Sequence, residues 1–438
     1  MKISGMVACG LVLVGMTAAA QSAKPVVVDG TWLVVVDYLG TMTYWDLKLE
    51  LKGDRLTGNF TEDKINEGSV AGNHVHFVAR DEMGGSEVFD GEVVKGEMAG
   101  TIVWTNGNSK DHPATRTFKA MQAGARPAAA PQRREFVPTV FYREFSALHA
   151  PVLRVNPGDT IHTTTVDAAG HDERGVERSL GGNPQTGPFY VETAMPGDTL
   201  AVHIVRLKLN RDYAVSDDSI VSRGMNGGLA IKMKDVGKQV KWHLDREGGM
   251  ARTESPGEHL KGYTVALRPM LGCIAAAPGP GRAAPNTGDS GSYGGNMDFN
   301  EIVEGATVYL PVSNPGALLY FGDAHAAQGD GEMNGNALET SMDVEVTVDV
   351  IPHKRAPGVR VENATHLMAM GLEGSLDEAF KSATANMAAW LAEDYKLSPS
   401  EVAQVIGTAA EYRVSEVADR NAGVVLKISK ERLRGVAP

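Results

Sequence analysis

The sequence has little cysteine, no excess of basic residues and no long hydrophobic segment after its first twenty residues. Of its two cysteines, Cys9 lies inside the apolar N-terminal stretch, so removal of that stretch would leave only Cys273 and no possible intramolecular disulfide. The formal net charge of −12 argues against a nucleic-acid partner, because phosphate binding requires clustered Lys and Arg. No later segment is long and apolar enough to span a membrane.

Several catalytic signatures are also missing. The sequence contains no phosphate-binding G-x-x-x-x-G-K-[ST] loop and no dinucleotide fingerprint. Gly288–Ser292 begins like the nucleophile elbow of serine hydrolases, but Ser292 stands where the final glycine should be, and no helix signal follows. A nucleotide-dependent enzyme and a serine hydrolase of this type are therefore not favoured.

The N-terminus predicts export. Lys2, an apolar stretch through Met16 and small residues up to Ala20 follow the order of a secretory signal peptide. We expect residues 1–20 to be removed and the mature protein to be periplasmic or secreted, with no membrane association after cleavage. Export without disulfides is typical of a bacterial enzyme that relies on its core for stability.

Residues 27–121 predict a small antiparallel β domain. Apolar residues alternate in four strand-like segments, and turns containing glycine separate them at hairpin spacing. These segments are 31–37, 45–51, 74–78 and 100–104. A short barrel or meander is the expected outcome. The domain has no cluster of His, Cys or acids, so we interpret it as an accessory module.

Residues 122–135 have the Pro/Ala composition of a linker, and residues 136–438 form the expected catalytic domain. Its pattern is mainly β, and two Pro-Gly-Asp-Thr segments, at 157–160 and 196–199, predict equivalent β-corners between strands. We expect a β-sandwich or barrel-like domain that ends in helices. The fold class is therefore mainly β, α+β in arrangement, with a small antiparallel β domain in front.

Two capping boxes predict the C-terminal helices. Ser375 and Ser398 are each followed three residues later by Glu, and an amphipathic segment comes after each of them. The apolar stripe behind the first box begins at Leu376 and Phe380 and is expected to be core. Two such helices would cover one face or edge of the β domain.

The densest polar segment is Leu319–Glu332. It places acids beside one His, and such a group is costly to hold together unless a cation or a shared proton offsets the repulsion. Asp323 and His325 stand two residues apart, so in an extended segment both side chains lie on one face, as a pair of metal ligands requires. A solvated polar turn is the plain alternative.

Residues near this segment complete a chemically sensible site. Asp298, Asp323 and His325 form a mixed oxygen and nitrogen set of the kind that holds zinc with one position open for water. The candidate metal ligands are Asp298, Asp323, His325 and Glu339. Glu332 is the candidate general base, and Asn296 or Gln328 can orient a carbonyl by hydrogen bonding. Each residue alone also suits an ordinary turn, so only their concentration favours a site.

Several motifs resemble the signature of the acetamidase/formamidase family. They are Asn183–Pro188, Pro269–Pro278, Gly295–Asp298, Tyr309–Val312, Pro315–Leu318 and Gly322–Glu332. The likeness covers about residues 140–435 and leaves residues 27–121 outside. It implies hydrolysis of a small linear amide to a carboxylate and ammonia on a β-rich fold, with zinc and calcium, in a homo-oligomer that is a dimer or larger. By motif it also implies that Asn183, Gly295 and Cys273 bind the substrate.

We therefore expect a metal-activated water to attack the amide carbonyl, while Glu332 takes a proton and passes it to the departing ammonia. Two alternatives stay open. In the first, Cys273 is the nucleophile of a cysteine-dependent amidase. In the second, the exported protein binds a ligand without catalysis, and its acidic loops hold a structural cation.

Overall fold

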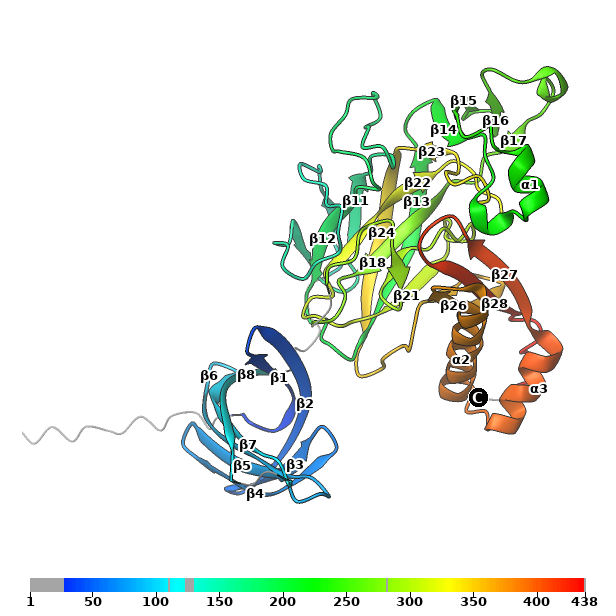
Figure 1. Ribbon diagram of the computed structural model, residues 1–438. Coiled ribbons are helices and arrows are strands. Elements are labelled where there is room, and N and C mark those ends of the chain that lie inside the picture. The colour runs from blue at the N-terminus through cyan, green and yellow to red at the C-terminus, as the bar shows by residue number, and fades with distance from the viewer. Residues whose placement is uncertain (1–26, 109–110, 123–129, 281–282, 437–438) are drawn as a thin grey trace, which may run out of the picture. The chain divides into compact units, whose positions relative to one another are not determined.

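The computed structural model describes residues 27–108, 111–122, 130–280 and 283–436. The described residues form two compact units, a smaller one within residues 27–122 and a larger one within residues 130–436 (Figure 1). The predicted signal peptide of residues 1–20 lies outside the described residues. Within those residues, no helix has the length and apolar character needed to cross a membrane.

The N-terminal unit is a closed barrel whose eight strands follow one another in sequence order. The strands are β1 Gly30–Tyr38, β2 Thr41–Lys52, β3 Arg55–Phe60, β4 Asp63–Ala71, β5 His74–Arg80, β6 Ser86–Val94, β7 Glu97–Thr105 and β8 Ala114–Gln122. Aromatic side chains fill the interior: Phe77 stacks on Phe89 with ring centroids 4.5 Å apart, and Phe118 meets Phe89 edge-on at 5.2 Å. The predicted small antiparallel β domain is confirmed as a barrel with a packed aromatic core.

The larger unit is built from two sheets, which hold eleven and nine strands within the described residues. The first sheet contains β10 Leu153–Val155, β12 Thr186–Val191, β14 Tyr213–Asp217, β15 Gln239–Asp245, β16 Met250–Thr253, β17 Val265–Ala266, β18 Met270–Ala276, β19 Ser290–Gly291, β20 Gly294–Asn296, β22 Leu319–His325 and β23 Glu339–Thr340. The second contains β9 Arg133–Glu135, β11 Thr160–Thr164, β13 Thr199–Leu209, β21 Thr307–Pro311, β24 Met342–Ile351, β25 Arg360–Glu362, β26 His366–Glu373, β27 Glu411–Glu416 and β28 Ala422–Ser429.

One apolar core joins the two sheets. It takes fully buried residues such as Phe321 and Ile274 from the first sheet and Val202 and Val346 from the second. The unit is therefore a mainly β structure with a sandwich-like core, as predicted. The two Pro-Gly-Asp-Thr corners are also alike, because Asp159 and Asp198 each accept a hydrogen bond from the backbone N–H three residues earlier.

The C-terminal helices are α2, Leu376–Asp394, and α3, Pro399–Ala409, which lie close together in Figure 1. The remaining helical segments are α1 Gly227–Lys232 and the 3₁₀ turns Ser222–Gly224 and Glu258–Leu260. Ser375 and Ser398 cap α2 and α3 as predicted, the second with a complete capping box. The buried side of α2 packs on β26 and β28 and includes Met387.

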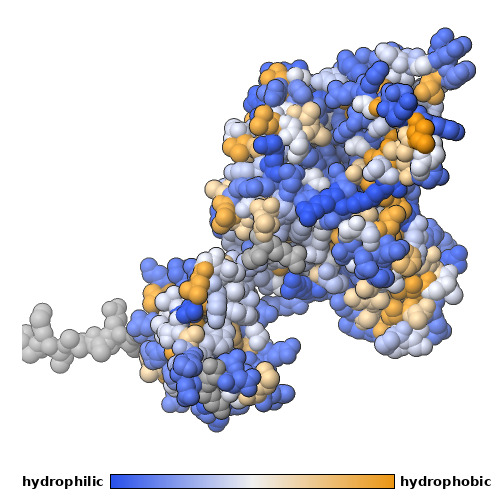
Figure 2. All heavy atoms as spheres, in the orientation of Figure 1, coloured by the Kyte–Doolittle hydropathy of each residue, from blue (hydrophilic) through white to orange (hydrophobic). Residues whose placement is uncertain are grey.

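Two details of the sequence interpretation are wrong. Leu376 and Phe380 were expected in the core, but they are 40% and 47% exposed, because the side of α2 that faces the sheet at this end is formed by Ala379 and Ala383. Figure 2 shows hydrophobic residues on the surface in the region where Figure 1 draws α2 and α3. The expected linker is also shorter at its C-terminal end, since Arg133–Glu135 form β9 and pair with β11.

Candidate active site

Strand register brings the central candidates together. Asp323 and His325 end β22, which lies between β18 and β23 in the first sheet. His325 is paired across the strands with Glu339, and β18 pairs on its other side with β20, which leads to Asp298 two residues beyond its end. Three separate segments thus deliver four of the predicted residues to one place.

The four predicted metal ligands form one buried cluster. His325 Nε2 lies 3.3 Å from Asp323 Oδ1, 3.2 Å from Glu339 Oε1 and 4.0 Å from Asp298 Oδ1. One ligand atom from each of Asp298, Asp323 and His325 lies within 4.8 Å of the others. Asp298 and His325 are fully buried and Glu339 is only 7% exposed. The cluster has the size and donor types of a divalent-cation site.

Gln328 orients the imidazole of His325. Its Oε1 accepts a hydrogen bond from His325 Nδ1 at 2.8 Å, and its Nε2 donates to the backbone oxygen of Asp298 at 2.5 Å. This pairing assigns the proton to Nδ1 and turns Nε2 toward the carboxylates, as in ligand histidines held by a second residue. Both ends of the Gln328 amide are therefore engaged, and we place it behind His325 and not at the substrate carbonyl.

Several buried atoms of the cluster lack a hydrogen bond. Within the described residues, Asp298 Oδ1, His325 Nε2 and Glu339 Oε2 have no partner of hydrogen-bond geometry. Such atoms are costly to bury unless something outside the protein chain satisfies them. A cation among the three would coordinate these same atoms, so the residues present fit a divalent metal.

Charge repulsion in the cluster also favours a bound cation. Burial raises the pKa of Asp298 well above its usual value, and the carboxylates of Glu332 and Asp323 raise it further. Burial also raises the pKa of Glu339 to about 7, although His325 opposes this. For His325, burial lowers the pKa, but the carboxylates of Glu339 and Asp323 outweigh it and raise the pKa well above its usual value. In the absence of metal, the cluster retains protons to offset its own charge.

Glycine makes room for the cluster. A Cβ atom at Gly272, in β18, would overlap carboxylate oxygens of both Asp323 and Asp298 and would press on the His325 ring. The neighbouring backbone is unusual too, because Asp298 and Asp323 both have positive φ, at 41° and 57°. Non-glycine residues rarely adopt this conformation unless the surrounding structure enforces it. Two acids of the site therefore have a strained backbone, and Gly272 leaves the space that their side chains occupy.

Glu332, the predicted general base, lies beside the cluster. It is 5% exposed, has φ of 45°, and its Oε1 accepts a hydrogen bond from the backbone N–H of Ala337 at 2.9 Å. One ligand atom from each of His325, Glu332 and Glu339 can lie within 4.8 Å of the others. Burial raises the pKa of Glu332 well above its usual value, which makes its carboxylate a better proton acceptor than a solvated one.

A chain of amides borders the cluster. Asn183 Nδ2 donates to Asn296 Oδ1 at 2.6 Å, and Asn296 Nδ2 in turn reaches Asp298 Oδ2 at 2.7 Å and Asp419 Oδ2 at 2.6 Å. Both asparagines line the cavity described below. The structure thus places the predicted residues Asn183 and Asn296 at the site, with Asn296 already holding two acids.

Two residues that the resemblance assigned to the substrate lie behind the site. Gly295 and Cys273 are not on the cavity surface of the described residues. A Cβ atom at Gly295 would overlap the backbone oxygen of Asp289, so this glycine permits close strand packing. Cys273 is fully buried, and burial together with Asp323 and Asp298 raises the pKa of its thiol well above the usual value. These features disfavour a thiolate nucleophile at Cys273.

The sequence interpretation missed two acids from the C-terminal hairpin. Glu416 ends β27 and Asp419 lies in the turn before β28, and ligand atoms of both can lie within 4.8 Å of one on Asp298. Burial raises the pKa of both carboxyl groups. Nothing local distinguishes these acids from ordinary turn residues, because only the fold brings them to Asp298.

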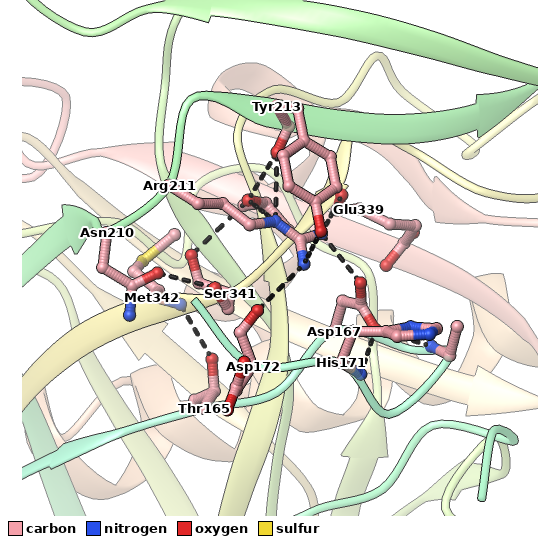
Figure 3. Close-up of polar contacts among 12 residues, drawn as sticks. Thr165, Asp167, His171, Asp172, Asn210, Arg211, Tyr213, Glu339, Ser341 and Met342 are labelled. Atoms are coloured by element: carbon pink, nitrogen blue, oxygen red, sulfur yellow. Dashed lines mark hydrogen bonds and ion pairs between the residues drawn. The ribbon is translucent and has the colours of Figure 1, made fainter. Parts of the chain in front are cut away.

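Arg211 braces the opposite side of the site (Figure 3). Its guanidinium is buried and forms an ion pair with Asp167, with 2.7 Å between Nη2 and Oδ2. It also donates to the backbone oxygen of Glu339 at 3.2 Å and to Thr340 Oγ1 at 3.1 Å. One buried cation therefore ties the loop of Asp167 to the strand that carries Glu339.

A cavity of about 700 Å³ opens onto the cluster. Asp323, Glu332 and Glu339 line its inner part, and β14 contributes Val215 and Asp217. Catalytic and ligand sites commonly occupy pockets of about 300–1,000 Å³. The arrangement can therefore bind a ligand against the acids and the imidazole, with room for a proton acceptor at Glu332.

Comparisons with known proteins agree with this geometry. Residues 281–367 match the model of the Acetamidase/Formamidase family, and this stretch holds all four predicted metal ligands. The crystal structure of acetamidase from Bacillus halodurans is 28% identical, with a TM-score of 0.60, over 70% of this chain and 100% of that one. The chain is thus similar in sequence to the acetamidase/formamidase family over residues 281–367 and has an acetamidase-like fold.

The crystal structure of acetamidase from Yersinia enterocolitica gives 26% identity and a TM-score of 0.60 over 71% of this chain and 96% of its own. The acetamidase of Mycolicibacterium smegmatis is 41% identical over 59 residues, which is 13% of this chain. The alignments cover only 10% and 14% of the length of the two curated relatives, from Schizosaccharomyces pombe and M. smegmatis.

Proposed function

We propose that the larger unit hydrolyses a linear amide to a carboxylate and ammonia. The observation that carries this proposal is the buried cluster of Asp298, Asp323, His325 and Glu339, whose unpartnered atoms lie next to a cavity that Glu332 also lines. The similarity of the chain to the acetamidase/formamidase family supports the same reaction class.

Asp298, Asp323 and His325, with Glu339 beside them, would hold a zinc ion. Such an ion polarises a carbonyl oxygen and makes a water molecule more acidic. The group of Asp298, Glu416 and Asp419 offers only oxygen ligands, which is the preference of calcium. Gln328 keeps His325 in the tautomer that turns Nε2 toward the acids. Arg211 fixes the backbone of Glu339 from the other side.

The proton transfers belong to Glu332 in this proposal. Its carboxylate takes a proton from the attacking water as the new carbon–oxygen bond forms, and then gives that proton to the amide nitrogen as the carbon–nitrogen bond breaks. The products are a carboxylic acid and ammonia, and transfer of the acid proton to ammonia in water leaves a carboxylate and ammonium. Its burial and its raised pKa suit both halves of this cycle. The Asn296 amide is already engaged at both ends, so its part in this proposal is to hold Asp298 and Asp419 at the wall of the cavity.

Variants of the cluster test the proposal. We expect Asp323→Asn and His325→Ala each to lower kcat/KM for a panel of short amides by about 100-fold or more, with loss of bound metal. Asp330→Asn is the matched control, because Asp330 lies in the same segment but pairs with Arg413 at the surface. Ammonia release and elemental analysis on the same samples give the two measurements.

The outcomes separate the alternatives. Full activity and metal content in both cluster variants would show the assignment to be wrong. Loss of activity on thiol alkylation with the metal retained would instead favour Cys273 as nucleophile. Absence of ammonia release from every amide, with metal present, would favour a binding protein that uses a structural cation.

We also propose export and self-association. The order of residues in 1–20 supports a cleaved signal peptide, which intact-mass measurement of the mature protein tests directly. The hydrophobic residues exposed at the start of α2 are compatible with a homo-oligomer, and the molar mass in solution measures it.

A further inference from the structure

The cavity is larger and more acidic than a two-carbon amide requires. Its volume of about 700 Å³ is in the range of pockets that hold drug-sized ligands. Six of its lining residues carry carboxylates, and among the described residues none that line it is Lys or Arg. These six are Asp167, Asp217, Asp323, Glu332, Glu339 and Asp419. The volume and the acidity of the cavity therefore indicate what the substrate carries beyond the scissile amide.

Most of these carboxylates already interact with other groups of the protein. Asp323, Glu332, Glu339 and Asp419 belong to the inner cluster or border it. Asp167, in the outer wall, is neutralised by the ion pair with Arg211 at 2.7 Å, and His171 lies 3.4 Å away from it. The charge of Asp167 is therefore not available to a ligand.

Asp217 differs from the others. It ends β14, and its Oδ2 accepts a hydrogen bond from Asn336 Nδ2 at 2.5 Å, but it has no ion pair with any described residue. The nearby cation Lys241 pairs instead with Glu254 at 3.4 Å and does not line the cavity. Asp217 thus presents an uncompensated negative charge to the cavity.

Strand register places this charge at a defined distance from the reacting end. Val215 is paired with Glu339, and Asp217 lies two residues further along β14 with its side chain on the same face. Two residues of a strand span about 7 Å. A molecule that reached from the inner cluster to Asp217 would carry its second functional group about that far from its carbonyl.

We infer that the substrate is an extended amide with a positively charged group at the end remote from the scissile bond, and that Asp217 recognises this charge. This inference rests on the proposed amide hydrolysis and names the substrate class of the same site. An ammonium or guanidinium group would gain an ion pair at Asp217, whereas a carboxylate would meet only negative charge.

A matched set of amides tests the inference on the full mature protein. The probes are 6-aminohexanamide, which is cationic, hexanamide, which is neutral, adipamate, which is anionic, and acetamide. We expect kcat/KM for 6-aminohexanamide to exceed that for hexanamide by about fivefold or more, mostly through KM, and adipamate to be the poorest of the three six-carbon amides.

Two variants locate the recognition. Asp217→Asn is expected to reduce the ratio of kcat/KM for 6-aminohexanamide to that for hexanamide to near one. Asp212 is exposed, immediately precedes β14 and does not line the cavity. Asp212→Asn removes the same charge and is expected to leave the ratio unchanged. A ratio that is equally altered by both variants would assign the preference to net charge and overturn the role of Asp217.

The two levels of the proposal fail differently. Hydrolysis of acetamide, hexanamide or adipamate at least as efficient as that of 6-aminohexanamide would overturn the cationic substrate class and leave amide hydrolysis intact. Absence of ammonia release from all four probes would overturn both.

Discussion

The acids around His325 are held in an arrangement that opposes the ordinary preferences of single residues. Asp298, Asp323 and Glu332 have positive φ, and all three are buried. Left-handed backbone costs roughly 1–2 kcal/mol per non-glycine residue, and burial of like charges adds to that cost. The surrounding strands must supply the compensating stability, which is the usual condition of a functional site.

Gly272 is the residue where this arrangement is most sensitive. We expect Gly272→Ala to remove activity and metal binding, because the new methyl group would displace the carboxylates of Asp323 and Asp298. Gly279→Ala is the control, since a Cβ atom there meets only Ser313 at 3.4 Å or more. Ammonia release and metal content measure the effect, and an active, metal-loaded Gly272→Ala protein would contradict the close packing described here.

Arg211 is the second sensitive residue. Arg211→Met should lower the free energy of unfolding by about 3–5 kcal/mol, because it leaves the buried Asp167 carboxylate without its partner. Arg154→Met removes an arginine from an exposed pair with Glu192 and should cost less than about 1 kcal/mol. Urea unfolding measures both.

A double variant identifies the cause of the Arg211 effect. Arg211→Met with Asp167→Asn removes the charge as well as its partner, so part of the lost stability should return. If the double variant were as unstable as the sum of the single variants, the ion pair would not be the reason.

At the scale of elements, the polar residues at the strand ends form a site only because strand pairing brings them together. β22, β18 and β20 place Gly322, Cys273 and Asn296 at consecutive positions across the sheet, with Asp323 next to Gly322, and β23 adds Glu339 opposite His325. The barrel also holds a buried acid on one of its strands. Glu87, in β6, is 6% exposed, and its Oε1 accepts a hydrogen bond from Trp104 Nε1 at 2.8 Å, while Oε2 has no partner in the described residues.

Glu87 makes the barrel sensitive to pH. Burial raises the pKa of Glu87 from 4.5 to about 6, although the bond from Trp104 opposes the shift. The folded state therefore retains this proton when the unfolded state has already lost it. Stability falls as pH rises from 4.5 to about 6 and is constant on either side, with a total loss of at most about 2 kcal/mol.

Glu87→Gln should remove this loss, because glutamine accepts the same bond without ionising. The difference in the free energy of unfolding between variant and wild type is expected to rise through that pH interval. Glu92→Gln changes an exposed acid on the same strand and should give a flat difference. A flat difference for Glu87→Gln as well would mean that its carboxyl group ionises as freely in the folded barrel as in the unfolded chain.

For the whole molecule, the two compact units predict two unfolding transitions. A cation bound at the acid cluster would stabilise only the larger unit, by about 2.7 kcal/mol at 100 times its dissociation constant. We expect added zinc to raise one calorimetric transition by about 5 °C and to leave that of the barrel unchanged.

The control for this experiment is the double variant Asp323→Asn/His325→Ala, in which zinc should move neither transition. A zinc-dependent shift of the barrel, or an equal shift in the double variant, would place the ion outside the proposed cluster.

Sequence pattern determined the local features of this protein. Alternation and turn residues predicted β1, β2, β5 and β7, and the capping boxes predicted α2 and α3, because these signals depend on neighbours along the chain. Motif and density also indicated Asp298, Asp323, His325 and Glu339, which the structure brings together. Only the tertiary structure added Glu416, Asp419, Arg211 and Gly272, which are distant in sequence and meet through strand register. Local sequence pattern carries no information on such strand pairings. The packing of the sheets therefore decided the positions of Gly272, of Arg211 and of the outer wall of the cavity.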